Sequence, residues 1–433
     1  MADAAPLTVR PAGALVGELT VPGDKSISHR AVMVGALNDE DVIVTGFGAS
    51  ADTLATVDAF RSMGVEIDRR GEDRLVIKGV GMRGLREPDG PIDVRNAGTL
   101  MRILPGILAG QRGTFVLDGD ESIRRRPMGR IAEPLGQMGV RVDTTDGLPP
   151  VTVHATGEVS PISFQPAVAS AQVKSSVLFA GLFAEHGMTV IEEPIATRDH
   201  TERMLQRAGV PVDRRPGRIA VSPVRELVLP EIPVPGDFSS AAPFIAAATI
   251  LQGSNLTIRD VSINPTRTGM LAVLERMGAR VGLFGRRWAA GEPVADIEVR
   301  PAELVATDIE PELIPSLIDE LPLLVLLASF ARGTTTIRGA GELRVKESDR
   351  IATVVELLST VGGRVKALED GFQVQGVPHR LRGGRVDAAG DHRIAMLGAI
   401  AGVCSQEGVS VDGADALAVS FPDFAERLAA VSA

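Results

Sequence analysis

Basic side chains recur in the turns of this chain, next to glycine, asparagine or aspartate and close to apolar stretches with helical character. The turns lie at 23–30, 95–102, 124–127, 197–202, 346–350 and 390–393. Lys25 stands at the start of one such helix, where free backbone N–H groups favour an anion. Ser26 and Arg30 are four residues apart and share a face of that helix. Several cations of this kind could bind two anions, such as a phosphate and a carboxylate.

Each of these features also has an ordinary structural explanation. A single Lys or Arg near a helix start is more often a solvated surface charge, and the triplet Arg124, Arg125 and Arg126 is typical of an exposed loop. The argument for a binding site rests on recurrence at equivalent positions of a repeat. In a chain with a formal net charge of −10, a local cluster of cations would attract an anionic ligand.

Acid–base chemistry has candidates in Asp319 and Glu347. Asp319 precedes an otherwise apolar helix, and Pro322 in its first turn also fits a plain N-terminal helix charge. Spacings of three and four predict that Lys346, Glu347 and Arg350 share one helix face, so that Glu347 could equally be a member of an intrahelical ion pair. These two carboxylates could act together in acid–base catalysis only if both face one cleft.

A repeated phrase predicts the elements that position these residues. A helix-like segment ends at a glycine and a strand-like segment follows, at Gly64, Gly139, Gly209, Gly278 and Gly362, about 70 to 84 residues apart. Glycine in this place is typical of a helix C-cap. Regular recurrence indicates one supersecondary unit copied several times. The pattern is strand, helix, strand, helix, strand, repeated about six times, which predicts an α/β fold.

Half of the predicted helices are apolar almost all round and are therefore expected to be buried. Examples are Ser176–Ala184, Ser240–Leu251, Pro322–Ala331 and Ile394–Val403. The last helix, Phe424–Val431, has no strand after it, whereas Leu7–Val21 is a surplus strand segment. We expect this segment to complete the last repeat. Residues 1–22 with 236–433 would then form one domain and 23–235 the other, with hinge crossings near 21–24 and 234–237, three repeats in each domain and a cleft between them.

The composition of the chain argues against several classes of protein. The acidic balance, the absence of Tyr and the single Trp argue against nucleic-acid binding. Nucleotide-binding glycine motifs are missing, and six His with one Cys suggest no metal set, so no cofactor or metal is expected. Met1–Gly17 does not have the pattern of a signal peptide, and the apolar run Leu321–Ala331 is too short to span a membrane. We expect a soluble cytoplasmic protein.

The ordered phrases of the chain resemble the 5-enolpyruvylshikimate-3-phosphate (EPSP) synthase family from about Leu15 to Phe424. The phrases are 24–30 (DKSISHR), 96–99 (NAGT), 126–127 (RP), 346–350 (KESDR) and 391–393 (DHR). Those at 170–174 (SAQVK), 198–202 (RDHTE) and 264–267 (NPTR) are similar to the class II branch. The resemblance implies a two-domain inside-out α/β barrel with six βαβαββ repeats, three in each domain, and a cleft between the domains.

The resemblance also implies an activity in the shikimate pathway, which leads to chorismate and aromatic amino acids. The enolpyruvyl group of phosphoenolpyruvate would pass to the 5-hydroxyl of shikimate 3-phosphate with release of phosphate, catalysed by Asp319, Glu347 and Lys25. Shikimate 3-phosphate would be bound by Lys25, Ser26, Arg30, Ser170, Ala171, Gln172, Arg198, Asp319 and Lys346. Phosphoenolpyruvate would be bound by Lys25, Asn96, Gly98, Arg126, Gln172, Arg350 and Arg393. A monomer that needs no other partner is expected.

Some positions depart from the family pattern. Val419 stands where many relatives have Lys, and His200 stands at about the place of a Tyr near the shikimate ring. Gly98 is kept, where some relatives that tolerate the inhibitor glyphosate have Ala, so this chain is expected to be a glyphosate target. Two alternatives are a UDP-N-acetylglucosamine enolpyruvyl transferase and a non-catalytic repeat protein that binds phosphorylated ligands. The first usually has a reactive Cys in the loop that corresponds to 119–128, where this chain has none.

Overall fold

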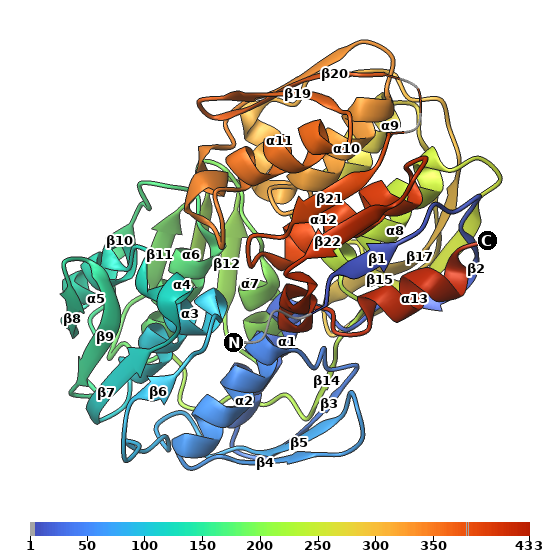
Figure 1. Cartoon of the computed structure of the whole chain (residues 1–433). Helices are drawn as coiled ribbons and strands as arrows, with labels where there is room; N and C mark the ends of the chain where they lie inside the picture. The colour runs from blue at the N-terminus through green and yellow to red at the C-terminus, as the bar shows by residue number, and fades with distance from the viewer. Residues whose placement is uncertain (1–4, 378, 380) are drawn as a thin grey trace. The chain divides into compact units, whose positions relative to one another are not determined.

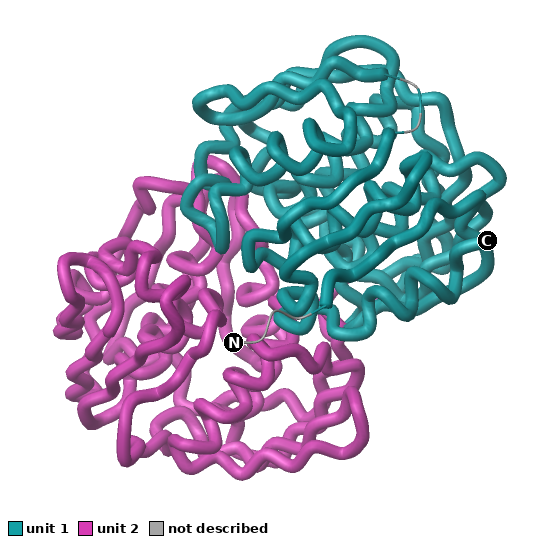
Figure 2. Tube along the Cα trace, viewed as in Figure 1, with its two compact units in different colours: residues 1–22, 235–287, 293–433 teal, residues 23–234, 288–292 magenta. Residues whose placement is uncertain are grey.

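The computed structural model of the chain describes residues 5–377, 379 and 381–433, which divide into two compact units (Figure 2). Unit 1 comprises the N-terminal segment up to Pro22, Pro235–Arg287 and Pro293–Ala433, and unit 2 comprises Gly23–Val234 and Trp288–Glu292. The stretch Met1–Gly17, in which no signal peptide is expected, has its first four residues outside the described part of the chain. Among the residues described, no helix combines the length and apolar character needed to cross a membrane.

Unit 2 contains sheets that are each built from one repeat. In the described residues the strand orders are β14-β3-β5-β4, β6-β7-β9-β8 and β10-β11-β13-β12. The elements in chain order are α1 (Lys25–Ala36), β3 (Asp41–Thr45), α2 (Ala51–Ser62), β4 (Glu66–Arg69), β5 (Leu75–Lys78), β6 (Ile92–Asp93), α3 (Gly98–Leu108), β7 (Gly113–Asp118), α4 (Glu121–Arg124), α5 (Gly129–Gln137), β8 (Arg141–Thr145), β9 (Leu148–Ala155), β10 (Ser163–Phe164), α6 (Ala171–Gly181), β11 (Thr189–Glu192), α7 (His200–Arg207), β12 (Val212–Arg215), β13 (Arg218–Val221) and β14 (Glu231–Pro233).

Unit 1 repeats the same plan (Figure 1). Its described strands are ordered β16-β17-β15-β2, β18-β20-β19 and β1-β22-β21. The elements are β1 (Leu7–Val9), β2 (Val16–Thr20), α8 (Phe238–Ile250), β15 (Asn255–Ser262), α9 (Gly269–Arg276), β16 (Arg280–Ala289), β17 (Glu292–Arg300), η1 (Pro311–Ser316), α10 (Leu321–Phe330), β18 (Thr334–Ile337), η2 (Gly341–Val345), α11 (Arg350–Thr360), β19 (Arg364–Leu368), β20 (Gly371–Gln375), β21 (Gly384–Asp387), α12 (His392–Val403), β22 (Val409–Asp412), η3 (Ala414–Val419) and α13 (Phe424–Val431). The tip of the β16–β17 hairpin, Trp288–Glu292, belongs to unit 2.

The pairing within most of the described sheets follows one rule, and the sheet β18-β20-β19 has only antiparallel pairs. The first strand of a repeat pairs parallel with the second across a buried helix, as β6 does with β7 and β10 with β11. The remaining pairs are antiparallel, as in β7 with β9 and β8 with β9. A parallel pair requires a crossover connection, whereas the antiparallel pairs need only short turns. This pairing confirms the predicted α/β repeat.

The N-terminal segment forms two strands in different sheets. β1 pairs antiparallel with β22 and thereby supplies a strand to the last repeat, which ends in α13. β2 pairs parallel with β15 and is the first strand of the repeat that contains α8. In the same way, β14 pairs parallel with β3 and adds a strand from the end of unit 2 to the sheet of the repeat that contains α1. The surplus segment 7–21 therefore serves two repeats, not one.

The repeated glycines adopt the backbone conformation that the sequence predicts. Their φ angles are +93°, +87°, +90°, +83° and +98° at Gly64, Gly139, Gly209, Gly278 and Gly362. Because an L side chain is strained in this left-handed region, glycine ends the helix there and redirects the chain into the next strand. The helix C-cap interpretation is confirmed.

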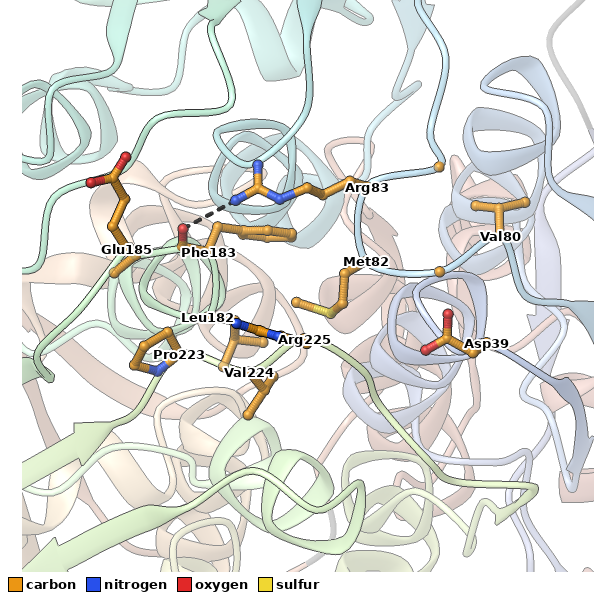
Figure 3. A pocket seen from close by; sticks show the side chains of 13 residues that line it. Asp39, Val80, Met82, Arg83, Leu182, Phe183, Glu185, Pro223, Val224 and Arg225 are labelled. Carbon is orange, nitrogen blue, oxygen red and sulfur yellow. Dashed lines mark hydrogen bonds between the residues drawn. The ribbon is translucent and has the colours of Figure 1, made fainter.

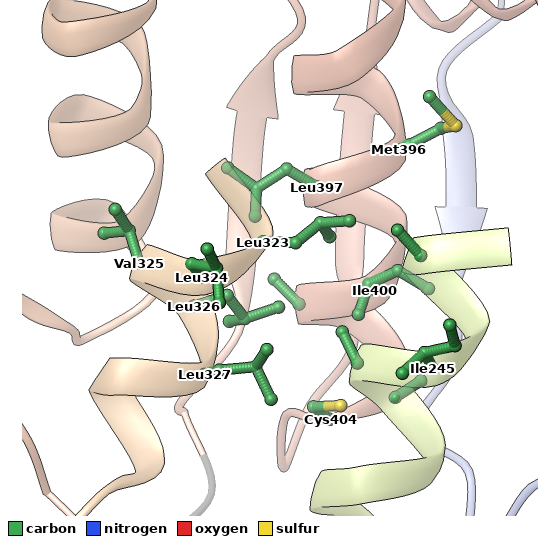
Figure 4. Packing of buried hydrophobic residues seen from close by; sticks show 14 of the residues in the cluster. Ile245, Leu323, Leu324, Val325, Leu326, Leu327, Met396, Leu397, Ile400 and Cys404 are labelled. Carbon is green, nitrogen blue, oxygen red and sulfur yellow. The ribbon is translucent and has the colours of Figure 1, made fainter. Parts of the chain in front are cut away.

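The predicted buried helices are confirmed, with small shifts at their ends. α8, α10 and α12 are buried along almost their whole length and pack against one another in unit 1. Leu324 and Leu327 of α10, Ile400 of α12 and Ile245 of α8 lie in this core (Figure 4). Full burial of such a side chain contributes about 1.5–3 kcal/mol. α1, α3 and α6 form the matching core of unit 2.

Close packing of α3 against α6 predicts a large effect of one added methyl group. A Cβ at Gly106 would lie 2.0 Å from the carbonyl oxygen of Ser176 and within 3 Å of two further backbone atoms. Because backbone on a buried helix cannot move aside freely, Gly106→Ala is expected to lower the free energy of unfolding by about 3 kcal/mol. Urea unfolding followed by circular dichroism measures it.

Gly136 on α5 is the matched control for Gly106. It is exposed, and a Cβ there meets no atom within 4 Å. Since Ala favours a helix over Gly, Gly136→Ala should raise the free energy of unfolding by about 0.5–1 kcal/mol. Equal effects of the two substitutions would contradict the packing argument.

Candidate active site

α1 begins where the sequence predicts and presents Lys25 at its first position. Asp24 is the N-cap, and its side chain accepts a hydrogen bond from the Ile27 backbone N–H. The ammonium of Lys25 lies 3.0 Å from Oδ2 of Asp52, which belongs to the first turn of α2. Lys25 is thus tied to a carboxylate on one side while about a fifth of its side chain stays accessible.

Arg30 faces the inside of unit 2. Its guanidinium donates to Thr201 Oγ1 (2.6 Å), Ser175 Oγ (2.9 Å) and the backbone carbonyl of Ser26 (2.9 Å). Burial lowers the pKa of Arg30 to about 10, and the neighbouring charge of Glu202 opposes this shift. The last contact confirms that Ser26 and Arg30 share one helix face.

The start of α3 brings Gly98 close to two arginines. A Cβ at Gly98 would lie 2.9 Å from Nη1 of Arg126 and 3.3 Å from Nη1 of Arg102. The Arg126 guanidinium donates to Oδ1 of Asn96 (2.7 Å). Within the described chain, no side chain caps the N-terminus of α3. Its first N–H groups and these guanidinium groups therefore form an environment that suits an anion.

α6 joins the start of α3 through Gln172. Oε1 of Gln172 accepts from Arg102 Nη1 (2.7 Å), and its Nε2 donates to Thr99 Oγ1 (3.2 Å). Ser170 is the N-cap of α6 and accepts from the Val173 backbone N–H, so Ala171 is the first helical residue. The predicted residues of the phrase 170–174 thus stand beside those of 96–102.

The Arg124–Arg126 triplet divides into different roles. Arg124 and Arg125 are exposed and pair locally with Asp118 (2.6 Å) and Glu121 (3.2 Å). The hydrogen bond from Arg124 lowers the pKa of Asp118. Only Arg126 is buried, because the short helix α4 ends just before it. The ordinary explanation of exposed surface charges therefore fits Arg124 and Arg125 but not Arg126.

In unit 1, Asp319 is surrounded by guanidinium groups. Its carboxylate lies 3.5 Å from Arg267, 3.5 Å from Arg350 and 3.6 Å from Arg393, and only 9% of the residue is exposed. Arg393 Nη1 also donates to the backbone carbonyl of Asp319 (3.1 Å). A carboxylate held in this way is close to several cations and still reaches the surface.

Lys346 and Glu347 do not lie on a helix, contrary to the sequence prediction. The 3-10 helix η2 ends at Val345 and α11 begins only at Arg350, with Asp349 as its N-cap. Glu347 nevertheless accepts a hydrogen bond from Arg350 (2.6 Å). Because the Asp349 side chain accepts from the backbone N–H groups of 351 and 352, the helix starts at this residue and Lys346 and Glu347 are left in the preceding turn.

Asp391 anchors Arg350 from the other side. Both residues are fully buried, and Nε of Arg350 lies 2.7 Å from Oδ2 of Asp391. Burial raises the pKa of the Asp391 carboxyl, and the charge of Arg350 with its hydrogen bond brings the net value below the ordinary one. Burial lowers the pKa of Arg350, but the charges of Asp391, Glu347 and Asp319 raise it overall. Arg350 therefore stays charged and fixed.

Several residues of these clusters were not among the predicted site residues. They are Asp52, Arg102, Asp237, Ser239, Arg267, Glu320 and Asp391. Arg267 and Asp391 lie inside the phrases that carry the family resemblance, and Arg102 lies in the basic turn 95–102, so their sequence neighbours were a usable signal. Asp52 and Glu320 carry no such signal, since only the folded chain brings them to Lys25 and Ser239.

His200 has a structural partner. It is fully buried, and its Nδ1 lies 2.8 Å from Oε1 of Glu292 at the tip of the β16–β17 hairpin. This contact holds the imidazole of His200 in the interior of unit 2, at the start of α7.

A cavity of about 810 Å³ lies at the opposite ends of the buried helices of unit 2. Asp39, Met82, Phe183 and Arg225 are among the residues that line it, and none of the predicted site residues does (Figure 3). Arg83 donates to the carbonyls of Gly110 (2.6 Å) and Phe183 (3.3 Å), just after the C-terminal ends of α3 and α6. The volume of a cavity therefore does not by itself identify the predicted site in this protein.

Among the described residues, no group of three or more His, Cys, Asp or Glu side chains could hold a metal ion. The free Cys404 is buried in the core of unit 1 (Figure 4).

The fold is shared by enolpyruvyl transferases. The enolpyruvyl transferase NikO from Streptomyces tendae matches 99% of this chain and 98% of its own with a TM-score of 0.79, at 18% identity. An EPSP synthase from Acinetobacter baumannii is more similar, with a TM-score of 0.89 and 40% identity over 99% of this chain and 98% of that one. The chain therefore has the inside-out α/β barrel fold of this class, with two units of repeats.

Sequence comparison identifies the family. The family model described as EPSP synthase (3-phosphoshikimate 1-carboxyvinyltransferase) matches residues 9–428. Proteins named 3-phosphoshikimate 1-carboxyvinyltransferase from Halorhodospira halophila and Acidithiobacillus ferrooxidans are 48% and 49% identical, over 97% and 96% of this chain and 94% and 95% of their own. The chain belongs to the EPSP synthase family, as its phrases indicate.

The buried His29 predicts how stability depends on pH. Burial, followed by the charges of Lys25 and Arg30, lowers the pKa of His29 well below 6.5. Below about pH 6.5 the unfolded chain binds a proton that the folded chain does not. The free energy of unfolding should therefore decrease as the pH is lowered below about 6.5. His29 should contribute up to about 1.4 kcal/mol of this loss per pH unit.

Urea unfolding between about pH 5 and pH 7.5 measures this slope. His29→Asn should lack the His29 component, while the exposed His186 serves as control and His186→Asn should keep it. Identical slopes in wild type and His29→Asn would contradict the prediction.

Proposed function

We propose that this chain transfers the enolpyruvyl group of phosphoenolpyruvate to the 5-hydroxyl of shikimate 3-phosphate and releases phosphate. The observation that carries the proposal is the family match over residues 9–428, together with arginine and lysine clusters at the starts of buried helices. It is thus a transferase of the shikimate pathway, which leads to chorismate and the aromatic amino acids.

In unit 2 the proposed role is anion binding. We propose that Lys25, Ser26, Arg30, Ser170, Ala171, Gln172 and Arg198 hold shikimate 3-phosphate, with Asp319 and Lys346 of unit 1. Gly98 lies at the uncapped start of α3 beside the Arg126 guanidinium, which supports binding of the phosphate of phosphoenolpyruvate by Lys25, Asn96, Gly98, Arg126 and Gln172. Arginine side chains suit this task because they stay charged and can donate two hydrogen bonds to one phosphate or carboxylate group.

In unit 1 the proposed role is proton transfer beside a fixed cation. Arg350 and Arg393 would bind phosphoenolpyruvate. Asp319 Oδ1 lies 3.5 Å from Nη1 of Arg350, and Glu347 Oε2 lies 2.6 Å from its Nη2. Guanidinium groups at Asp319 and Glu347 would stabilise the carboxylate forms after each proton leaves. The arrangement supports acid–base work by these two carboxylates, with Lys25 as the third group.

The reaction then follows in two steps. The 5-hydroxyl oxygen attacks C2 of phosphoenolpyruvate and loses its proton, while C3 gains a proton and becomes a methyl group. The C2–O bond to phosphate next breaks, and a methyl proton is removed to restore the double bond. Arginines already in place stabilise the charge that develops on the phosphate without rearranging.

The rival enolpyruvyl transfer to UDP-N-acetylglucosamine is less well supported. That activity usually relies on a Cys in the loop equivalent to 119–128, which has none here, and Cys404 is buried in an apolar core. The family match is to EPSP synthase.

We further propose a cytoplasmic monomer that uses no nucleic acid and no membrane. Its two domains would be 1–22 with 236–433, and 23–235, with hinge crossings near 21–24 and 234–237. The described division of the chain at Pro22 and Val234 supports these boundaries.

A phosphate-release assay tests the function directly. Phosphate should appear only when phosphoenolpyruvate and shikimate 3-phosphate are both present, and mass spectrometry should detect the enolpyruvyl ether. Turnover with UDP-N-acetylglucosamine in place of shikimate 3-phosphate would favour the rival activity. Binding of both substrates without turnover would favour the non-catalytic alternative.

Removing either proposed acid–base group should slow turnover. Asp319→Ala or Glu347→Ala is expected to lower kcat by about 10²-fold or more, because general acid–base help is lost. Glu356→Ala, at an exposed position of α11, is the matched control and should keep kcat near the wild-type value. A near-normal kcat in Asp319→Ala would remove this residue from the proposed chemistry.

Gly98 should set sensitivity to glyphosate, which is longer than phosphoenolpyruvate. We expect the wild type to be inhibited. In Gly98→Ala the new methyl group would meet the movable end of Arg126, at 2.9 Å, and shorten the pocket. The inhibition constant should rise by at least about tenfold, or roughly 1.4 kcal/mol, with a smaller rise in KM for phosphoenolpyruvate. An already tolerant wild type would show that other residues set the pocket length.

A further inference from the structure

A buried ion cluster in unit 2 lies directly behind the segment that carries Arg198. Lys174 of α6 is only 1% exposed. Its ammonium lies 2.9 Å from Oε1 of Glu193 and 2.8 Å from Oε1 of Glu202, and these two residues are buried as well. A buried ammonium requires such partners. None of the substrate-binding roles proposed above uses these three side chains.

The cluster holds the peptide bond that leads into Arg198. Lys174 Nζ donates to the carbonyl oxygen of Thr197 (3.3 Å), while Oε1 of Glu193 accepts from the Thr197 backbone N–H (3.1 Å) and from its hydroxyl. Because a peptide bond is planar, the Thr197 carbonyl and the Arg198 nitrogen turn together. Lys174 therefore restrains the plane from which Arg198 departs.

The residue on the other side of Arg198 is restrained too. Asp199 is 3% exposed, and its carboxylate accepts from Arg203 Nε (2.8 Å) and from Arg214. Asp199 is also the N-cap position of α7. Arg198 itself is half-buried between these two buried neighbours. The backbone thus presents one side chain from a segment that is otherwise tied down.

The charge of the cluster acts on the same neighbourhood. Two carboxylates and one ammonium leave an excess negative charge if all are ionised. Glu202 and Arg198 both act electrostatically on Arg30, with opposite signs. The cluster therefore lies close enough to the proposed shikimate 3-phosphate residues to influence them without touching the ligand.

We propose that Lys174 is a positioning residue for shikimate 3-phosphate: its ammonium, held by Glu193 and Glu202, fixes the Thr197 peptide and so aims Arg198 at the ligand. This inference rests on the proposed function. It adds a residue that contacts neither substrate and acts through another side chain. A rigid support of this kind matters because small misplacements of a binding group weaken its contacts.

The test compares Lys174→Met with the double variant Lys174→Met/Glu202→Gln. The single variant leaves two carboxylates without their ammonium, which costs stability by itself. The double variant restores the wild-type charge of the cluster but still lacks the donor to the Thr197 carbonyl. Both should raise KM for shikimate 3-phosphate by about tenfold or more and leave KM for phosphoenolpyruvate within about twofold. Calorimetric titration with shikimate 3-phosphate alone should show the same loss.

Arg83→Met is the control for destabilisation without a binding effect. Arg83 also holds backbone carbonyls in unit 2, but near the C-terminal ends of α3 and α6. It should lower Tm and leave both KM values unchanged. An unchanged KM for shikimate 3-phosphate in Lys174→Met, or its return to normal in the double variant, would overturn the positioning role. A wild type without turnover would overturn the proposed function and this inference together, whereas a turning-over wild type isolates the effect of Lys174.

Discussion

Helices that are buried on all sides present their polar backbone groups only at their ends, and this constraint organises both units. α1, α3 and α6 in unit 2, and α8, α10 and α12 in unit 1, bury nearly all their side chains in apolar cores. Their first N–H groups must be satisfied by caps, by side chains from neighbouring elements or by a ligand. The clusters described above gather where these helices begin, so core packing and binding chemistry share one cause.

The two units satisfy the constraint with different chemistry. At the starts of the unit 2 helices, Arg102 and Arg126 lie beside the uncapped start of α3, and Lys25 stands at the start of α1, which favours anions. At the starts of the unit 1 helices, guanidinium groups alternate with carboxylates, as in Asp319 between Arg267 and Arg393. A carboxylate among fixed cations can give up and regain a proton while its ionised form remains stabilised. The repeated fold thus supports clusters of different charge composition at the helix starts of its two units.

Restraint of the backbone complements this electrostatic design. Arg350 is fixed by Asp391 and Glu347, and the Thr197 peptide before Arg198 is fixed by Lys174 and Glu193. In both cases a buried carboxylate sets the position of a cation or of the chain next to it. Such support lets charged groups act without rearranging when a charge develops on the substrate.

The sequence by itself determined the repeat, the buried helices and most of the clustered residues. Glycine at a left-handed position and helices apolar on every face are local properties, so Gly64 or α12 can be recognised without neighbours. The tertiary structure decided which partners meet. The sequence prediction placed Lys346 and Glu347 on a helix because their spacing from Arg350 is compatible with one. In the structure Asp349 caps α11, so the helix begins only after these two residues. Asp52 at Lys25, and Glu193 and Glu202 at Lys174, come from distant segments, and burial selects such pairs only once the chain has closed around them.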